Sequence, residues 1–312
     1  MPAAHMYIFS DACPTDWLTP GEEHQWHTIV NFSVQTNPAL FAAGPSDISH
    51  ETALTRDPDY QELLATLTSQ LPYRSLKKWN TRGGYKARFA RALASFGQER
   101  SPIINALSFR EGDLRSSERA VLAAYNSRIG GVEGRGISFA EYTDKRGRRC
   151  LRHKFLNFHG LHTLEGPDSQ LLVLLLMAWR IADQYAFYYR EIVQSGRYGF
   201  SDLIVTVVSD RLSGDDEIKR KSEQLLQNLI DPEAERSPIR LTRSKQSDTF
   251  SGDLFVDNCA GLLNAAISDP TSEAALAARQ ASRLLDRGWH ALSPDLAEIH
   301  LRSALELIRP AA

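Results

Sequence analysis

Three aspartates that are far apart in the sequence occupy positions where a carboxylate could do chemistry. Asp11 and Asp210 each close an apolar run typical of a strand, and Asp257 interrupts an apolar, small-residue run typical of a helix. An ionised carboxylate in a packed helix is costly unless it is paired or binds a cation. Carboxylates that converge from separate elements are a common way to hold divalent metals. The pattern predicts a catalytic site for divalent metals, with Asp248 and Asp253 as candidates for supporting or substitute ligands.

A structural interpretation of the same residues stays open. An aspartate at the end of a strand often forms a turn or caps the next helix, which would account for Asp11 and Asp210 without any ligand. Asp257 is harder to explain in this way, because it lies within the helical run itself.

The elements that must position these acids mix strands and helices. Apolar periodicity and turn residues predict an antiparallel pair of strands at 6–11 and 25–34 and further strands at 103–109, 203–209 and 239–242. Residues 136–165 resemble a basic hairpin. Helices are expected at 59–70, 84–97, 167–194, 215–230, 253–268, 272–288 and 294–308. This order favours the α/β class and a single domain over residues 1–312, with an elaboration at about 36–200.

Two segments are rich in cations that could bind phosphates. The first contains Lys77, Lys78, Arg82 and Lys86 among the aromatic residues Trp79, Tyr85 and Phe89, and the second contains Arg146, Arg148 and Arg149. Phosphate-binding cations combined with aromatic rings that stack on bases are typical of nucleic-acid binding. The alternative for both segments is a solvated surface, with the aromatic side chains of the first one in the core.

Composition limits the partners and the compartment. The net charge of −2 excludes a general polycation, so nucleic acid must be bound by local patches. Three cysteines without a C-x-x-C pair fit a reducing cytoplasm. The most apolar run, residues 171–179, is too short to span a bilayer, so we expect a buried helix and no membrane partner.

Both ends of the chain carry motifs that resemble a known family. Residues 7–13 read Tyr-Ile-Phe-Ser-Asp-Ala-Cys and residues 254–261 read Leu-Phe-Val-Asp-Asn-Cys-Ala-Gly. They resemble the domain-of-unknown-function 3800 family, which opens on a strand ending in Asp-Glu-Ser-Gly and closes on Leu-Gln-Leu-Ala-Asp-x-x-Ala-Gly. The resemblance covers both termini and the strand near 205, where it implies Asp210 as the middle acid. It departs from the family at Ala12, where the family has an acid.

The resemblance implies an RNase H-like mixed sheet with an antiparallel front, helices on both faces and a helical insertion. It also implies a nuclease that depends on Mg²⁺ or Mn²⁺, in which Asp11, Asp210 and Asp257 hold the metals, with a role in defence or on mobile elements. Because of Ala12, the alternative is an inactive binding or interaction module, acting with nucleic acid, a protein partner or a second copy through the aromatic side chains of helix 167–195. A third reading is an enzyme that acts on a nucleotide or another small phosphorylated molecule.

Overall fold

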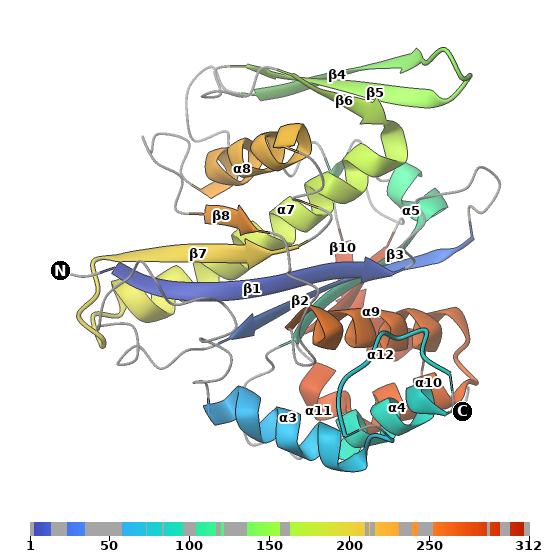
Figure 1. The fold of residues 1–312 in the computed structure, drawn as a ribbon. Helices are drawn as coiled ribbons and strands as arrows, with labels where there is room; N and C mark the ends of the chain where they lie inside the picture. The colour runs from blue at the N-terminus through green and yellow to red at the C-terminus, as the bar shows by residue number, and fades with distance from the viewer. Residues whose placement is uncertain are drawn as a thin grey trace.

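The computed structural model describes residues 3–13, 24–34, 58–72, 74–82, 84–95, 104–116, 120–121, 136–156, 163–209, 212, 216–230, 239–242, 252–285, 288–293 and 300–308. Within them a seven-stranded sheet forms the middle layer (Figure 1). Its spatial order is β10 (His300–Ser303), β9 (Trp289–Ser293), β3 (Ile104–Arg110), β2 (Trp26–Val34), β1 (Ala3–Cys13), β7 (Asp202–Val208) and β8 (Ile239–Thr242).

The sheet is mixed, and its antiparallel and parallel parts meet at β1. β1 pairs antiparallel with β2, and β2 pairs antiparallel with β3. On its other edge β1 pairs parallel with β7, and β7 pairs parallel with β8. An antiparallel front, a parallel flank and helices on both faces make this the RNase H-like α/β arrangement that the sequence predicts.

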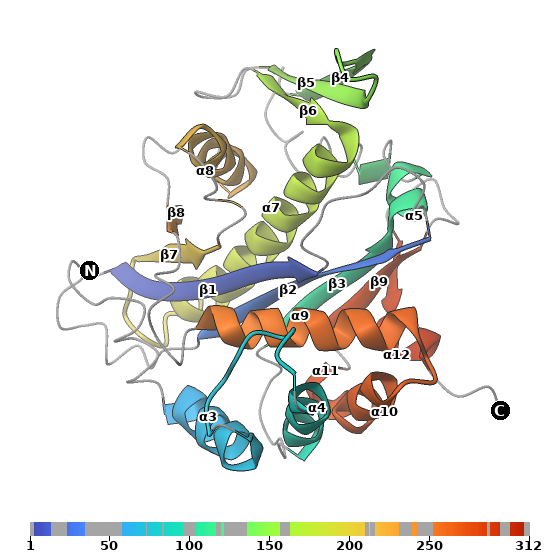
Figure 2. The ribbon, with the colours of Figure 1, turned by 45° about the vertical axis from the view of Figure 1, so that its right-hand side comes forward.

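Helices cover the two faces of the sheet and create two apolar cores (Figure 2). One face is covered by α7 (Asp168–Tyr189), which continues as one π-helical turn, η1 (Arg190–Gln194), and by α8 (Asp216–Ile230). The other face is covered by α9 (Gly252–Ser268), with α3 (Pro58–Gln70), α4 (Tyr85–Ser95), α10 (Glu273–Gln280) and α11 (Ser282–Leu285) beyond it.

Part of the predicted elaboration at 36–200 belongs to the central layers. β3 is a strand of the main sheet, followed by the short α5 (Glu111–Ser116), and α7 fills the core on one face. The expected basic hairpin is a separate three-stranded sheet of β4 (Gly136–Thr143), β5 (Arg149–Leu156) and β6 (Thr163–Pro167).

Helix α7 is a core helix. Among the described residues, one segment, Leu171–Gln194, is long and apolar enough to cross a bilayer, and 72% of its apolar window is buried inside the protein. This burial confirms the predicted buried helix. Tyr185 and Tyr188 are buried as well, so these two side chains cannot contribute to the aromatic interface expected for an interaction module. Phe187 is 49% exposed.

The predicted helix at 294–308 is wrong. Of the described part of this range, residues 300–303 form β10, antiparallel to β9, and Ala304–Leu307 is helical, as α12. The apolar residues of this segment have helical spacing: Leu301, Ala304, Leu305 and Ile308. Residues 300–303 are nevertheless extended, because they pair with β9, which is itself paired with β3.

Candidate functional site

Asp11 lies near the carboxyl end of β1. Side chains alternate along β1, and Tyr7 and Phe9 belong to the core beneath α9, whereas Ile8 and Ala12 belong to the core beneath α7. The alternation places Asp11 on the α9 face. Its side chain is half-buried, and Oδ1 accepts a hydrogen bond from the Ala12 N–H at 2.7 Å.

Strand β7 leads toward the second predicted acid. The parallel register pairs Phe9 with Val208, and the buried Ser209 follows. Asp11 is two residues beyond Phe9 and Asp210 is two residues beyond Val208. Asp210 and Asp248 both lie outside the described residues, so their assignment as ligands stays a prediction.

Helix α9 crosses the face of the sheet on which Asp11 lies. It begins against β1, where a Cβ on Gly252 would approach the Phe9 ring to 2.5 Å. One turn later Phe255 packs on Phe32 of β2, with ring centroids 4.8 Å apart. Further along, Asn264 Oδ1 accepts a hydrogen bond from Thr28 Oγ1 at 3.2 Å. The half-buried Asp253 is in the first turn of this helix.

Asp257 has a backbone partner that the sequence does not predict. Its Oδ2 accepts a hydrogen bond from the Trp79 N–H at 2.7 Å. Burial raises the pKa of the Asp257 carboxyl, and the Trp79 hydrogen bond and the charge of Lys78 oppose this rise. The carboxylate is therefore engaged with the segment before α4.

The neighbouring Asn258 secures the same segment. Its Nδ2 donates hydrogen bonds to the carbonyl of Lys77 at 2.7 Å and to the carbonyl of Leu254 at 2.5 Å. The Lys77 N–H in turn donates to the Tyr85 hydroxyl at 2.9 Å. Burial raises the pKa of Tyr85 to about 12, so the phenol stays neutral. Residues of α9 and α4 thus fix the backbone of residues 77–79.

Gly261 completes a seat for Trp79. A Cβ on Gly261 would lie 2.2 Å from Cδ1 of the indole, so only glycine allows this close approach. Asp257 and Gly261 are four residues apart and share one face of α9. Lys86 Nζ lies over the same indole, 5.1 Å from its centroid. The Asp-x-x-Ala-Gly motif therefore holds Trp79 by its N–H and its ring, and the four-residue spacing is the sequence signal for such an approach.

The described acids do not assemble into a metal centre by themselves. Within the described ranges, no three His, Cys, Asp or Glu side chains gather closely enough to hold a metal ion. Asp11, Asp253 and Asp257 all lie within the described ranges and do not form such a group. A metal site that uses Asp11 therefore needs acids from outside those ranges.

The first basic segment presents cations, but two of its three aromatic rings lie in the core. Lys78, Arg82 and Lys86 are exposed and Lys77 is half-buried. Tyr85 and Phe89 are fully buried and Trp79 is 8% exposed. The expected stacking of bases on Tyr85 and Phe89 is therefore wrong, and helix packing, the alternative for these two residues, is confirmed.

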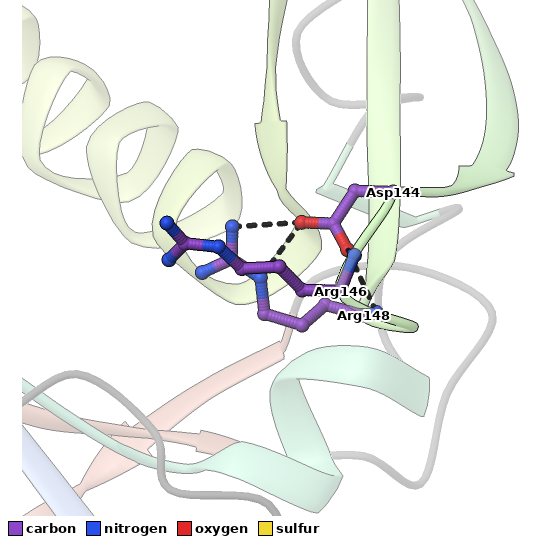
Figure 3. A network of polar contacts seen from close by, with 3 residues as sticks. All are labelled: Asp144, Arg146 and Arg148. Atoms are coloured by element: carbon purple, nitrogen blue, oxygen red, sulfur yellow. Dashed lines mark hydrogen bonds and ion pairs between the residues drawn. The ribbon is translucent and has the colours of Figure 1, made fainter.

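Acids of its own sheet balance the second basic segment. In the turn between β4 and β5, Asp144 accepts hydrogen bonds from the backbone of Arg146 and Arg148 and forms an ion pair with the Arg148 guanidinium at 2.7 Å (Figure 3). Arg149 pairs with Glu141 at 2.6 Å. This sheet lies beyond α7 and α8, on the opposite side of the main sheet from α4 (Figures 1 and 2). The structure therefore does not bring the two basic segments together.

Comparisons of the chain with protein-family models, with curated proteins and with solved structures found no match.

Proposed function

We propose that this protein is a divalent-metal-dependent nuclease that hydrolyses phosphodiester bonds in nucleic acid. The position of Asp11 carries the proposal. This carboxylate lies near the carboxyl end of β1, on the face crossed by α9, and the adjacent parallel strand β7 ends two residues before Asp210 in the sequence. The RNase H-like sheet and the resemblance of both termini to the domain-of-unknown-function 3800 family support the same conclusion.

The residues fit Mg²⁺ or Mn²⁺ in kind, because carboxylate oxygens are the ligands that these cations prefer. Asp11 and Asp210 would hold the metal, with Asp253 and Asp248 as supporting acids. When bound, such a metal lowers the pKa of a coordinated water and neutralises charge on the phosphate. The protein itself supplies a rigid strand end, which fixes the carboxylate of Asp11 before any metal binds.

In this proposal Asp257 is a positioning residue. It anchors the backbone from which Lys77 and Lys78 project, and these lysines, with Arg82, would bind the phosphates of the substrate strand. Fixing the backbone lowers the entropy that the lysines lose when they bind a phosphate.

Cleavage assays on single-stranded and double-stranded DNA and RNA with Mn²⁺ test the proposal. Asp11→Asn and Asp210→Asn should each lower the cleavage rate by more than about 100-fold, since even second-shell partners of metal ligands are worth 10–100-fold. Asp202→Asn, at the exposed start of β7, is the matched control and should cleave as the wild type does. Equal cleavage by the wild type and Asp11→Asn would refute the proposal. Binding of nucleic acid with no cleavage by the wild type would favour the inactive binding module.

A further inference from the structure

Helices α4, α9 and α10 enclose an open groove of about 440 Å³. Helix α9 lies between the main sheet and the other two helices, so the groove is separate from the strand ends that carry Asp11 (Figures 1 and 2). Its walls are mostly apolar and include Ala87, Ala90, Leu262, Ala265 and Ala277. Pockets of this size and lining are typical of sites for small organic groups.

Trp79 forms a rigid part of the groove wall. Its N–H is held by Asp257 and its ring is packed against Gly261, so the indole has little freedom before a ligand arrives. Pre-organisation of this kind lowers the entropic cost of binding. Leu276 also lines the groove and is 50% exposed, although it is a large apolar side chain. A ligand in the groove would cover it.

The polar residues of the groove are divided between two helices. Lys86 and Arg91 project from α4, and both are exposed. Glu273 and Gln280 project from α10. Cations on one side suit a phosphate, and the carboxylate and amide on the other side can accept hydrogen bonds from an amino group. An apolar slot with hydrogen-bonding groups at its edge is how proteins hold an unstacked nucleobase.

We propose that this groove binds one amino-bearing base of a single-stranded nucleic acid, with the adjoining phosphate on Lys86 and Arg91. The inference rests on the proposed nuclease function and assigns it a substrate class, an unpaired strand. It also gives Asp257 and Gly261 a second role, because their contacts with Trp79 shape the groove that would receive the base.

Calorimetry in EDTA with adenosine 5′-monophosphate, and with ribose 5-phosphate as the ligand that lacks a base, tests the inference. Adenosine 5′-monophosphate should bind at least about tenfold more tightly, since contacts with one base are worth roughly 5- to 150-fold in affinity. Ala274→Leu should weaken its binding by about tenfold, because the larger side chain fills the groove while every charge is kept. Ala65→Leu, the same change on the exposed surface of α3, should have no effect.

A charge-matched pair of variants separates the groove from general electrostatics. The variant Arg91→Gln should weaken binding of adenosine 5′-monophosphate, whereas Arg88→Gln, at an exposed residue of α4 that does not line the groove, should not. Equal binding of the two ligands, or an equal effect of Arg88→Gln, would overturn the inference. Because the calorimetry is done in EDTA, it tests the groove independently of the proposed metal-dependent nuclease. Cleavage without nucleotide binding rejects only the groove, and nucleotide binding without cleavage rejects only the nuclease.

Discussion

Asp257 and Gly261 act as one unit at the scale of single residues. The carboxylate satisfies the N–H of Trp79 and the missing side chain of glycine admits its ring, although Trp79 is 178 residues away from Asp257 in the sequence. A buried carboxylate that accepts a backbone hydrogen bond avoids part of the cost of an unpaired charge. The hydrogen bond from Trp79 therefore accounts for Asp257 in an otherwise apolar helix, and no bound metal is needed to explain it.

We expect Gly261→Ala to lower the free energy of unfolding by about 1–3 kcal/mol, the usual cost of overpacking a core. The new methyl group would overlap the indole of Trp79, which is held in place by Asp257. Gly166→Ala is the matched control, because its nearest side-chain atom would be 3.8 Å from the new Cβ. Urea unfolding of the two variants compares them. Equal stability of Gly261→Ala and the wild type would contradict the proposed seat for Trp79.

The raised pKa of Asp257 predicts how stability depends on pH. A carboxyl group whose pKa is higher in the folded than in the unfolded protein favours folding at low pH, and this contribution is lost as the pH rises from the ordinary value of 3.8 through the folded-state pKa. Asp257→Asn removes this titration but keeps an oxygen that can accept the Trp79 hydrogen bond. Relative to the wild type, the variant should therefore gain stability as the pH rises above the ordinary carboxyl value of 3.8. A constant difference across unfolding titrations at several pH values would contradict the assignment.

At the scale of elements, local patterns predict most of the fold, and long-range pairing accounts for the errors. The strands at 6–11 and 25–34 and the helix at 253–268 are confirmed, because their periodicity and turn residues are encoded locally. The strand of residues 300–303 depends on β9, which depends on β3 almost 200 residues earlier, and no local signal reports that pairing. The hydrogen bond between Trp79 and Asp257 could not be predicted for the same reason, because the two residues are 178 positions apart in the sequence. The exposed cations of the basic segments were visible in the sequence, but the pairing of Arg149 with Glu141 joins two strands.

The three-stranded sheet of β4, β5 and β6 should be sensitive to acid. His153 of β5 is fully buried, and burial lowers its pKa to about 4. The unfolded chain binds this proton near pH 6.5, so the contribution to stability is complete above that pH and is lost as the pH falls toward 4. His153→Leu should flatten the stability profile in this window, as measured by urea unfolding. His24→Gln, at an exposed residue before β2, should retain the wild-type profile, and an unchanged profile in His153→Leu would contradict the prediction.

At the scale of the whole molecule, the main sheet separates the two basic segments. The segment that carries Lys77, Lys78 and Arg82 is hydrogen-bonded to α9. The β4–β5 turn lies beyond α7 and α8 (Figures 1 and 2). A strand bound along the α9 side should release counterions only from the first group. The triple variant Lys77→Gln, Lys78→Gln, Arg82→Gln should lower the slope of log affinity against log salt by about 2 for single-stranded DNA.

The matched triple variant Arg146→Gln, Arg148→Gln, Arg149→Gln should leave that slope unchanged. Two of its three arginines are already paired with acids of their own sheet. Anisotropy titrations of a labelled strand at several salt concentrations give both slopes. Equal losses in the two variants would show that binding extends over both sides of the molecule and would contradict a single interface.

Calorimetric titration of Mn²⁺ into the wild type, Asp11→Asn and Asp257→Asn tests the central claim most directly. We predict that the wild type binds the metal, that Asp11→Asn loses this binding, and that Asp257→Asn keeps it, because Asp257 holds the Trp79 backbone and not the cation. Absence of binding by the wild type at millimolar Mn²⁺, or wild-type binding by Asp11→Asn, would contradict a carboxylate metal site at the end of β1. Loss of Mn²⁺ binding in Asp257→Asn would show that Asp257 is a metal ligand and would contradict its role as a positioning residue.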